Sequence, residues 1–350
     1  MSLLSNIIAL SLTVTSISHA DVKESIRYYQ IPDSNGLPLS IATDKKENIW
    51  FVEVNDNSIG KFDPAKEQFF RYKVPTSRSF PADLAVDSKG KIWFVEFDAN
   101  QLGSLEPSTG KIEEYEIPTN NSQPYRIAID KKDNIWFTQF AGNKIGRFDQ
   151  KSRHIKEYII PTRQSQPTGI VTDSADNVWF IETQGNKLSK LDPAKGKFLE
   201  FALPESFSAP NEMTIDDKGL IWLGARTKKK ILKFSPNTAV FEEYAIPGDG
   251  VSEGLSADMS GTIWYCNKHK NRVGRFSSID KSFVEIDVSE GDGSPVDIIA
   301  SASGNIWFTV VGTNKLGTIN GKMISGEKGP KLAVNGLGEK GRELLKQMNR

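Results

Sequence analysis

Apolar and polar residues alternate along most of the chain in short runs, and the same runs return at a nearly constant interval. One interval reads QPYRIAID (123–130), NIWFTQ (134–139), NKIGRFD (143–149) and IKEYIIPT (155–162). The runs are rich in β-branched and aromatic residues, and Asp, Asn and Gly separate them, which is typical of antiparallel strands joined by hairpins. We therefore expect each interval to form four strands, named a to d in chain order.

Tryptophan marks the interval. Each tryptophan follows an Ile or a Val, and successive tryptophans lie 43, 43, 43, 43, 42 and 43 residues apart. A period of this length, built from strand-like runs, is the signature of propeller blades, each a four-stranded sheet. The pattern predicts an all-β protein, a seven-bladed β-propeller with four-stranded blades, whose tryptophans are Trp50, Trp93, Trp136, Trp179, Trp222, Trp264 and Trp307.

The outer strand of the last blade is expected to come from the N-terminal side of the repeats. The pattern of strand d appears before the first tryptophan, at Ile26–Pro32, and no similar run follows the last strand c at Asn314–Gly317. A ring closed in this way leaves no open sheet edge. We therefore expect one propeller domain over residues 21–320, with its N-terminal strand closing the last blade.

Both ends of the chain differ from the repeats. Residues 1–20 contain no Lys, Arg, Asp or Glu and end in Ser18-His19-Ala20, the small-x-small pattern of a signal peptidase site. We expect a signal peptide and a periplasmic or secreted protein. The alternative is an uncleaved anchor, but the apolar stretch is shorter than the roughly twenty residues that span a bilayer. Residues 321–350 are Gly- and Lys-rich, and we expect a solvated tail or, alternatively, a tail docked on one face.

Composition narrows the classes of partner. The chain has 44 Lys and Arg against 44 Asp and Glu, so no net charge attracts it to nucleic acid or to an anionic membrane. No segment after residue 20 is apolar enough to span a bilayer. The single cysteine, Cys266, excludes an intramolecular disulfide. We expect a monomer whose partner is a small-molecule ligand or a protein, with no nucleic acid and no membrane span.

Four motifs of the repeat resemble a known family. They are Pro-x-x-Ile-x-x-Asp, Asn-Ile-Trp-Phe-x-Glu, Asn-Lys-Ile-Gly-Arg-Phe-Asp and Glu-Tyr-x-Ile-Pro-Thr, and together they resemble the virginiamycin B lyase (streptogramin lyase) family over about residues 26–320. The resemblance implies a seven-bladed propeller that opens a cyclic depsipeptide by elimination across its ester, with a magnesium ion beside a histidine base. Because fold alone does not carry function, the site is compared position by position.

Hairpin geometry indicates where a site would lie. Strands a and b form a hairpin, so the start of a and the end of b lie on one face of the ring, beside the central channel. We call the residue after the proline of strand a the ring position. The candidate positions are Leu39, Ala82, Tyr125, Thr168, Asn211, Glu253 and Val296 in the ring, and Glu53, Glu96, Gln139, Glu182, Ala225, Asn267 and Val310 at the ends of strand b.

The resemblance also implies which residues would catalyse. In the lyases, histidines occupy the ring position of blades six and seven, a Glu precedes the proline of blade seven, and another Glu ends its strand b. The matching residues here are Glu253, Val296, Ser294 and Val310, and the lyases' first-blade aromatic corresponds to Leu39. Val and Ser neither hold a divalent cation nor take a proton near neutral pH. We therefore expect the lyase machinery to be absent, and the catalytic residues stay unassigned.

Other reactive residues have ordinary explanations. His154 and His269 fall in turns and are expected to be solvated, and Cys266 falls inside a strand b and is expected to be buried and inert. Lysines gather in the loops before strand c of blades five and six, at Lys228–Lys230 and around His269. We expect solvated loops there, with a docking patch for an anionic ligand as the alternative.

Polar ring positions suggest a binding site. Glu182, Asn211, Glu253 and Asn267 supply the carboxylate and amide oxygens that Ca²⁺ or Mg²⁺ takes, and we expect them to converge as metal ligands, with a water-filled channel mouth as the alternative. Tyr125, Thr168, Asn211 and Glu253 are the expected ligand-binding residues. Short stretches at 209–211 and 252–254 also resemble metal-ligand strands of gluconolactonase-type propellers.

Two functions remain open at this point. The first is an exported lyase-like propeller that binds a small polar ligand or a partner at its channel face. The second is a metal-assisted lyase or hydrolase that acts on a cyclic ester or lactone, which requires a bound cation and a titratable base in a deep pocket.

Overall fold

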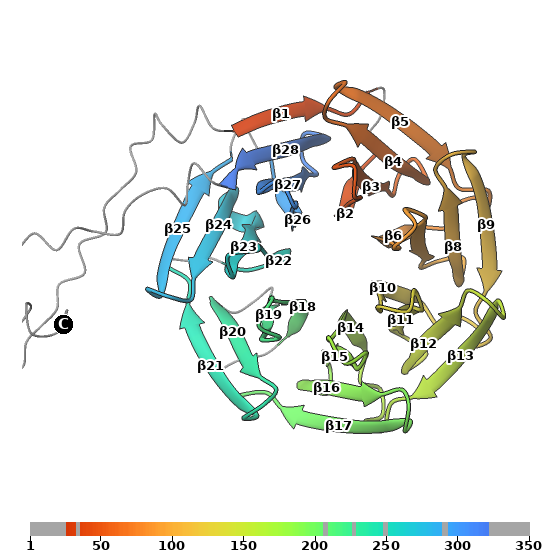
Figure 1. The fold of residues 1–350 in the computed structure, drawn as a ribbon, viewed down its shortest axis with the longest axis vertical. Helices are drawn as coiled ribbons and strands as arrows, with labels where there is room; N and C mark the ends of the chain where they lie inside the picture. The colour runs from red at the N-terminus through yellow and green to blue at the C-terminus, as the bar shows by residue number, and fades with distance from the viewer. Residues whose placement is uncertain are drawn as a thin grey trace, which may run out of the picture.

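The protein is a seven-bladed β-propeller. The computed structural model describes residues 26–32, 36–205, 209–225, 229–247, 251–288 and 293–321. These residues form seven four-stranded antiparallel sheets around a central axis (Figure 1) and one short 3₁₀-helix, η1 (Lys268–Lys270). The expected signal peptide and all but the first residue of the expected tail lie outside the described residues. In the described part, no helix is long and apolar enough to cross a membrane.

The strands follow the repeat. Blade one contains β2 (Pro38–Thr43), β3 (Ile49–Glu53), β4 (Ser58–Asp63) and β5 (Gln68–Lys73). Blade two contains β6 (Pro81–Val86), β7 (Ile92–Glu96), β8 (Gln101–Glu106) and β9 (Lys111–Glu116). Blade three contains β10 (Pro124–Ile129), β11 (Ile135–Gln139), β12 (Lys144–Asp149) and β13 (His154–Ile159). Blade four contains β14 (Pro167–Thr172), β15 (Val178–Glu182), β16 (Lys187–Asp192) and β17 (Lys197–Ala202).

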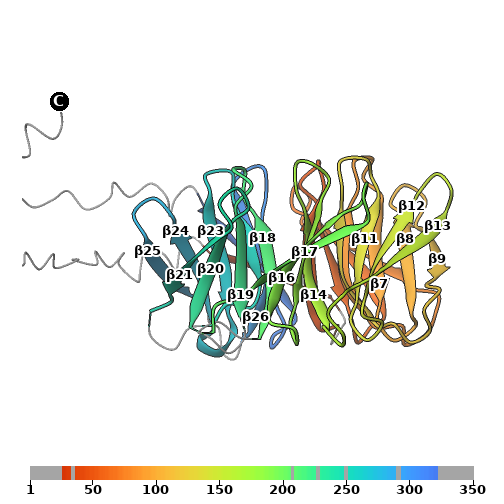
Figure 2. The same cartoon turned by 90° about the horizontal axis from the view of Figure 1, so that it is seen from below.

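The remaining blades continue this order around the ring. Blade five contains β18 (Pro210–Ile215), β19 (Ile221–Ala225), β20 (Lys230–Ser235) and β21 (Val240–Ala245). Blade six contains β22 (Leu255–Ala257), β23 (Thr262–Asn267), β24 (Arg272–Ser277) and β25 (Ser282–Asp287). Blade seven contains β26 (Pro295–Ala300), β27 (Asn305–Val310), β28 (Lys315–Asn320) and β1 (Ile26–Gln30). Seen from the side, the strands run between the two faces of a flattened ring (Figure 2).

The N-terminal strand closes the ring, as the sequence predicts. Strand β1 pairs with β28 in antiparallel register, with Tyr28 opposite Gly317. The Tyr28 hydroxyl donates to the carbonyl of Val288 at 2.6 Å, which ties the closing strand to blade six. The two ends of the repeat region therefore meet in one sheet (Figure 1), which removes the exposed edge of an open ring.

Six blades share a tryptophan latch. An aspartate in the turn between strands a and b accepts a hydrogen bond from the indole N–H six residues later, as from Trp136 to Asp130 at 2.9 Å. The same carboxylate accepts the backbone N–H groups of Lys132 and Asn134, so it holds both the turn and the ring. The latches are Asp44–Trp50, Asp87–Trp93, Asp130–Trp136, Asp173–Trp179, Asp216–Trp222 and Asp258–Trp264.

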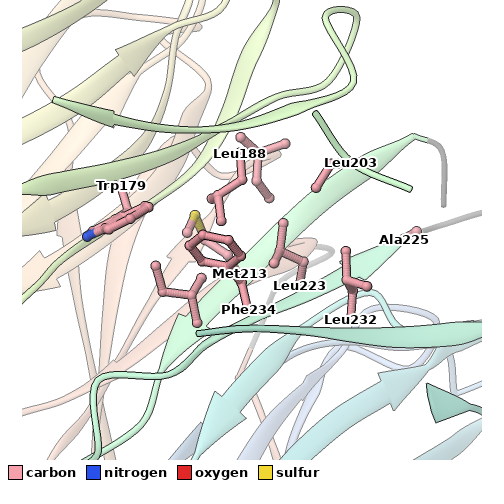
Figure 3. Packing of buried hydrophobic residues seen from close by; sticks show 10 residues of the cluster. Trp179, Leu188, Leu203, Met213, Leu223, Ala225, Leu232 and Phe234 are labelled. Carbon is pink, nitrogen blue, oxygen red and sulfur yellow. The ribbon is translucent and has the colours of Figure 1, made fainter. Parts of the chain in front are cut away.

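The tryptophans pack between neighbouring blades. Trp179 of blade four is buried in one apolar cluster with Leu223 and Phe234 of blade five (Figure 3). The ring centroids of Trp179 and Phe234 lie 5.7 Å apart. Burial of such large aromatic surfaces at each blade junction is the main source of stability in a chain without a disulfide.

A glycine in strand c opens a path across five of the sheets. In blade three, a Cβ at Gly146 would lie 2.2 Å from Cζ of Phe137, so the aromatic ring of strand b lies flat over the glycine. Because strand c has no side chain there, residues of strand b can reach across it toward strand d. The glycines are Gly60, Gly103, Gly146, Gly274 and Gly317.

Candidate functional site at the channel mouth

The ring positions lie at one end of the channel, where the hairpin geometry places them. In blade three, Pro124 of β10 pairs with Gln139 of β11, so the start of strand a and the end of strand b are neighbours. The register shifts between Pro124 and Ile127, and similar irregularities follow the first proline of the corresponding hairpins in blades one, two, four, five and seven. The bulge changes where the following side chains point. We call this end of the channel the mouth.

One side of the mouth is aromatic. Tyr125 lies between Phe97 and Phe140, with a centroid separation of 6.1 Å to each ring. Phe80 extends the group, at 5.8 Å from Phe97. All four side chains are half-buried, so part of each ring is open to a ligand. Tyr125 was among the predicted residues. The phenylalanines were not, although Phe97 and Phe140 directly follow the ends of strand b in blades two and three.

The other side of the mouth is polar. The hydroxyl groups of Thr168 and Thr183 are 2.8 Å apart, and Thr183 donates to the carbonyl of Pro210 at 2.7 Å. Next in the ring, Asn211 is 5% exposed, and neither its side-chain oxygen nor its nitrogen has a hydrogen-bond partner within the described part of the chain. Glu253 follows in blade six and is 9% exposed. An unpaired buried amide costs stability, so Asn211 is suited to a partner supplied from outside.

Two members of the predicted metal set, Glu182 and Asn267, form hydrogen bonds within their own blades. Glu182 accepts a hydrogen bond from Ser189 in its own blade, and Asn267 donates to Glu285 in its own blade at 2.8 Å. Burial raises the pKa of Glu182, and the bond from Ser189 opposes the shift. In the described part of the chain, no hydrogen bond or ion pair joins any two of Glu182, Asn211, Glu253 and Asn267. Metal binding by this set stays a prediction.

Charged side chains line the channel one position beyond the predicted ring. Arg126 forms an ion pair with Glu212 of blade five and lies 3.5 Å from Asp83 of blade two. Its guanidinium also lies 5.2 Å from the centroid of Tyr125, which joins the channel charges to the aromatic side of the mouth. Sequence reasoning missed this group. A signal was present, because a charged residue in an otherwise apolar inner strand needs a partner.

Two of the channel carboxylates each accept a hydrogen bond from the next blade. Asp83 accepts the backbone N–H of Ile127 at 2.9 Å, and Asp297 accepts that of Ile41 at 3.1 Å. Burial raises the pKa of Asp297 to about 6, since the charge of Arg126 only partly offsets it and Asp83 adds to it. The carboxylates are therefore structural parts of the channel wall.

The positions that match the lyase machinery lie in apolar or backbone-bonded surroundings. Val310 is 1% exposed and packs in a cluster with Phe308 and Ile298. The backbone N–H of Ser294 donates to the side-chain oxygen of Asn271 at 3.0 Å. A valine in this core offers neither a metal ligand nor a base.

The remaining candidates have structural surroundings. Cys266 is fully buried, and burial raises the pKa of its thiol well above its usual range. Lys230 and Arg272 form ion pairs with Glu243 and Glu285, so these two members of the predicted basic patch have internal partners. His154 is exposed at the start of β13. Among the described residues, no group of three or more His, Cys, Asp or Glu side chains is arranged to hold a metal ion.

Together, these features define a class of protein: a closed seven-bladed propeller with a mouth that is aromatic on one side and polar on the other. The sequence profile of the virginiamycin B lyase family matches residues 10–176 and 132–326. The chain belongs to this family. A comparison with curated proteins found no match.

Solved structures of lyases are similar throughout the propeller. A streptogramin B lyase is 28% identical, with a TM-score of 0.79, and the match covers 84% of this chain and 97% of that chain. The virginiamycin B lyase from Staphylococcus aureus is 26% identical, with a TM-score of 0.78 and 84% and 98% of the two chains covered. A catalytically inactive form of that enzyme with quinupristin is 25% identical, with a TM-score of 0.78 and the same coverage.

Proposed function

We propose that this protein is an exported member of the family that binds a small ligand or a partner at the channel mouth and does not open streptogramins. The preferred ligand carries a ring or another apolar group on one side and hydrogen-bonding groups on the other. Export rests on the uncharged, apolar composition of residues 1–20 and their small-x-small ending.

The observation that carries the proposal is the two-sided mouth. Half-exposed aromatic rings around Tyr125 provide a stacking surface, and the unpartnered amide of Asn211 provides a donor and an acceptor across the ring. Ligand sites commonly combine an apolar lining with a few polar groups that orient the ligand. Such an arrangement binds without needing a base or a nucleophile.

Loss of the lyase reaction rests on the matched positions. The residues that stand where the family has its histidines and glutamates are Glu253, Val296, Ser294 and Val310. Glu253 alone among them has a group that could ligate a cation or accept a proton. An elimination that needs both a metal ion and a separate base therefore lacks part of its machinery.

The alternative is a metal-assisted lyase or hydrolase that acts on a cyclic ester or lactone. It is supported by the same unpartnered Asn211 oxygen together with the nearby blade-six carboxylate of Glu253, which could hold Mg²⁺ or Ca²⁺ with water completing the shell. In this alternative, ligand binding would depend on the cation. In the binding-module proposal, it would not.

A thermal-shift screen separates the two. The full chain would be tested with aromatic amino acids, aryl glycosides, lactones and quinupristin, each with calcium, with magnesium and with chelator. We expect stabilisation by a ring-bearing ligand in chelator, lost in Tyr125→Ala and Asn211→Ala and retained in Asp217→Ala, a variant in an a–b turn at the other end of the channel. Stabilisation that requires a cation and is lost in Glu253→Ala would favour the enzyme instead.

A further inference from the structure

Away from the channel, each blade has a polar group where strands b, c and d meet on one face. In blade three, Glu157 of strand d lies opposite Gly146, and four donors reach its carboxylate. They are Lys144 Nζ at 2.8 Å, Gln139 Nε2 at 2.9 Å, and the backbone N–H and hydroxyl of Thr119 at 3.2 and 2.9 Å. We call the positions of Gln139, Lys144 and Glu157 the b–c–d site.

Six blades place a Lys or Arg in this site. In blade one, Arg71 of strand d makes two bonds of 2.8 Å to Glu53. In blade seven, Lys315 lies 5.7 Å from the ring centroid of Tyr28. The other pairs are Lys144–Glu157, Lys187–Glu200, Lys230–Glu243 and Arg272–Glu285.

Blade two has no Lys or Arg in this site, and it differs from blade three in two residues. Glu96 stands where blade three has Gln139, and Gln101 stands where it has Lys144, while the acidic residue of strand d, Glu114, is retained. One of the lost groups is a cation. Within the described residues, no salt bridge joins Glu96 or Glu114 to a Lys or Arg.

Two side chains of this site have buried oxygen atoms that lack partners. Glu96 is fully buried, and neither of its carboxylate oxygens has a hydrogen-bond partner in the described part of the chain. The side-chain oxygen of Gln101 is also buried without a partner. Ser79 lies near Glu96, but its hydroxyl donates to Asn57 at 3.0 Å. Glu114 is held by Thr76, whose N–H and hydroxyl donate to it at 2.9 and 3.0 Å.

Blade four shows what two carboxylates in this site require. It has Glu182 and Glu200 at the same two positions, and there Lys187 lies 2.8 Å from Glu200 and Ser189 donates to Glu182. Blade two has Gln101 instead of the lysine and Gly103 instead of the serine. A buried carboxylate without a counter-charge costs stability. Blade four supplies this counter-charge with the ammonium group of its lysine, whereas blade two has a neutral glutamine at the same position.

We infer that a hard divalent cation binds in the b–c–d site of blade two, between Glu96 and Glu114 and with the amide oxygen of Gln101 as a further ligand. Carboxylate and amide oxygens are the ligands that calcium takes, and water can complete its shell. Gln101 also lines a depression of about 400 Å³, together with Asn100, Glu116 and Asn120. This depression gives the ion a route from solvent through polar side chains.

The test uses the full chain, dialysed against chelator, with calorimetric titrations of calcium chloride and magnesium chloride. We expect one site per chain. Gln101→Lys, which supplies the ammonium of blade four, should abolish binding and raise the melting temperature without added metal. Glu96→Gln, which copies blade three, should also abolish it, and Asp217→Ala, in an a–b turn of blade five, should leave it unchanged.

A mirrored variant provides the matched control. Lys187→Gln removes the ammonium group from blade four and should create a second, weaker site of the same kind. Two results would overturn the inference: no heat and no melting-temperature shift with either cation at millimolar concentration, or binding that persists in both Gln101→Lys and Glu96→Gln. In the first case, Glu96 and Glu114 share a proton and no metal.

Discussion

The junctions between blades and the wall of the central channel follow different rules. At the junctions, a buried tryptophan recurs in each blade, and six of the seven are held by the same aspartate latch. Along the channel, the positions after the first proline of strand a vary from Tyr125 and Arg126 to Thr168 and Gly169 and to Asn211 and Glu212. The difference shows where packing dictates the residue and where the chain is free to carry a specific chemistry.

Removing the strand that closes the ring should have the largest effect on stability. Deleting residues 21–32 removes β1 and with it the burial of Ile31 and the contacts of Tyr28 and Tyr29 on blade seven. We expect a loss of more than about 5 kcal/mol in the free energy of unfolding, since several large side chains lose their buried surface. Chemical denaturation measures the loss. An unchanged unfolding midpoint would mean that another segment supplies the fourth strand.

Disrupting a single junction between two blades should lower the free energy of unfolding by a smaller amount. Trp136 is 1% exposed and packs with Ile170 and Phe180 of the next blade. Trp136→Ala should lower the free energy of unfolding by about 3–5 kcal/mol because it leaves a cavity and removes the indole hydrogen bond to Asp130. The exposed Leu199→Ala is the control and should change little. A similar small effect of both variants would show that the junction does not hold the blades together.

The b–c–d site of blade two should make the stability of the protein depend on pH. With chelator present, the pKa of Glu96 is about 8 in the folded chain against 4.5 in its unperturbed state. The folded state therefore holds the proton more tightly, so this contribution to stability is complete below pH 4.5 and is lost as the pH rises to 8. Glu96→Gln should be more stable than the wild type at pH 9 by on the order of 2–4 kcal/mol. Equal unfolding midpoints at pH 5 and pH 9 in both proteins would contradict this.

Substitutions at the mouth should change the stability of the protein only slightly. Asn211→Ala removes a buried amide that has no partner in the described part of the chain, so we expect a change in the free energy of unfolding of no more than about 1 kcal/mol. Tyr125→Ala should cost only about 1–2 kcal/mol because its ring is half-open to solvent. Thermal unfolding of both variants checks this. A large loss in Asn211→Ala would mean that the side chain supports the fold and is not free for a ligand.

The propeller could be predicted because the packing that holds its blades together repeats at a fixed interval in the sequence. Each blade must bury one tryptophan against its neighbour, so the interval between tryptophans reports the blade, and the displaced copy of strand d at Ile26–Pro32 reports the closure. The location of the mouth follows from the same hairpins. The location of the mouth depends on backbone pairing alone.

The side chains of the site were harder to predict because small irregularities decide their direction. The bulge after the proline moves the charged channel group to Asp83, Arg126 and Asp297, one position beyond the predicted ring. Glu96 was among the candidate positions, but its meeting with Glu114 depends on a path across Gly103 that only the folded sheet reveals. The sequence did contain one signal for this site: Gln101 occupies the repeat position at which blades three and four have Lys144 and Lys187.

We propose that the mouth has kept the place of the family's site and lost its reaction. The most direct measurement is to incubate the purified full chain with quinupristin or virginiamycin B and magnesium chloride and to follow the cyclic compound by mass spectrometry. We predict that the compound stays intact, because Glu253, Val296, Ser294 and Val310 do not supply both a metal site and a base. Formation of the linear product, abolished by chelator and by Glu253→Ala, would contradict the account and restore the lyase function to this chain.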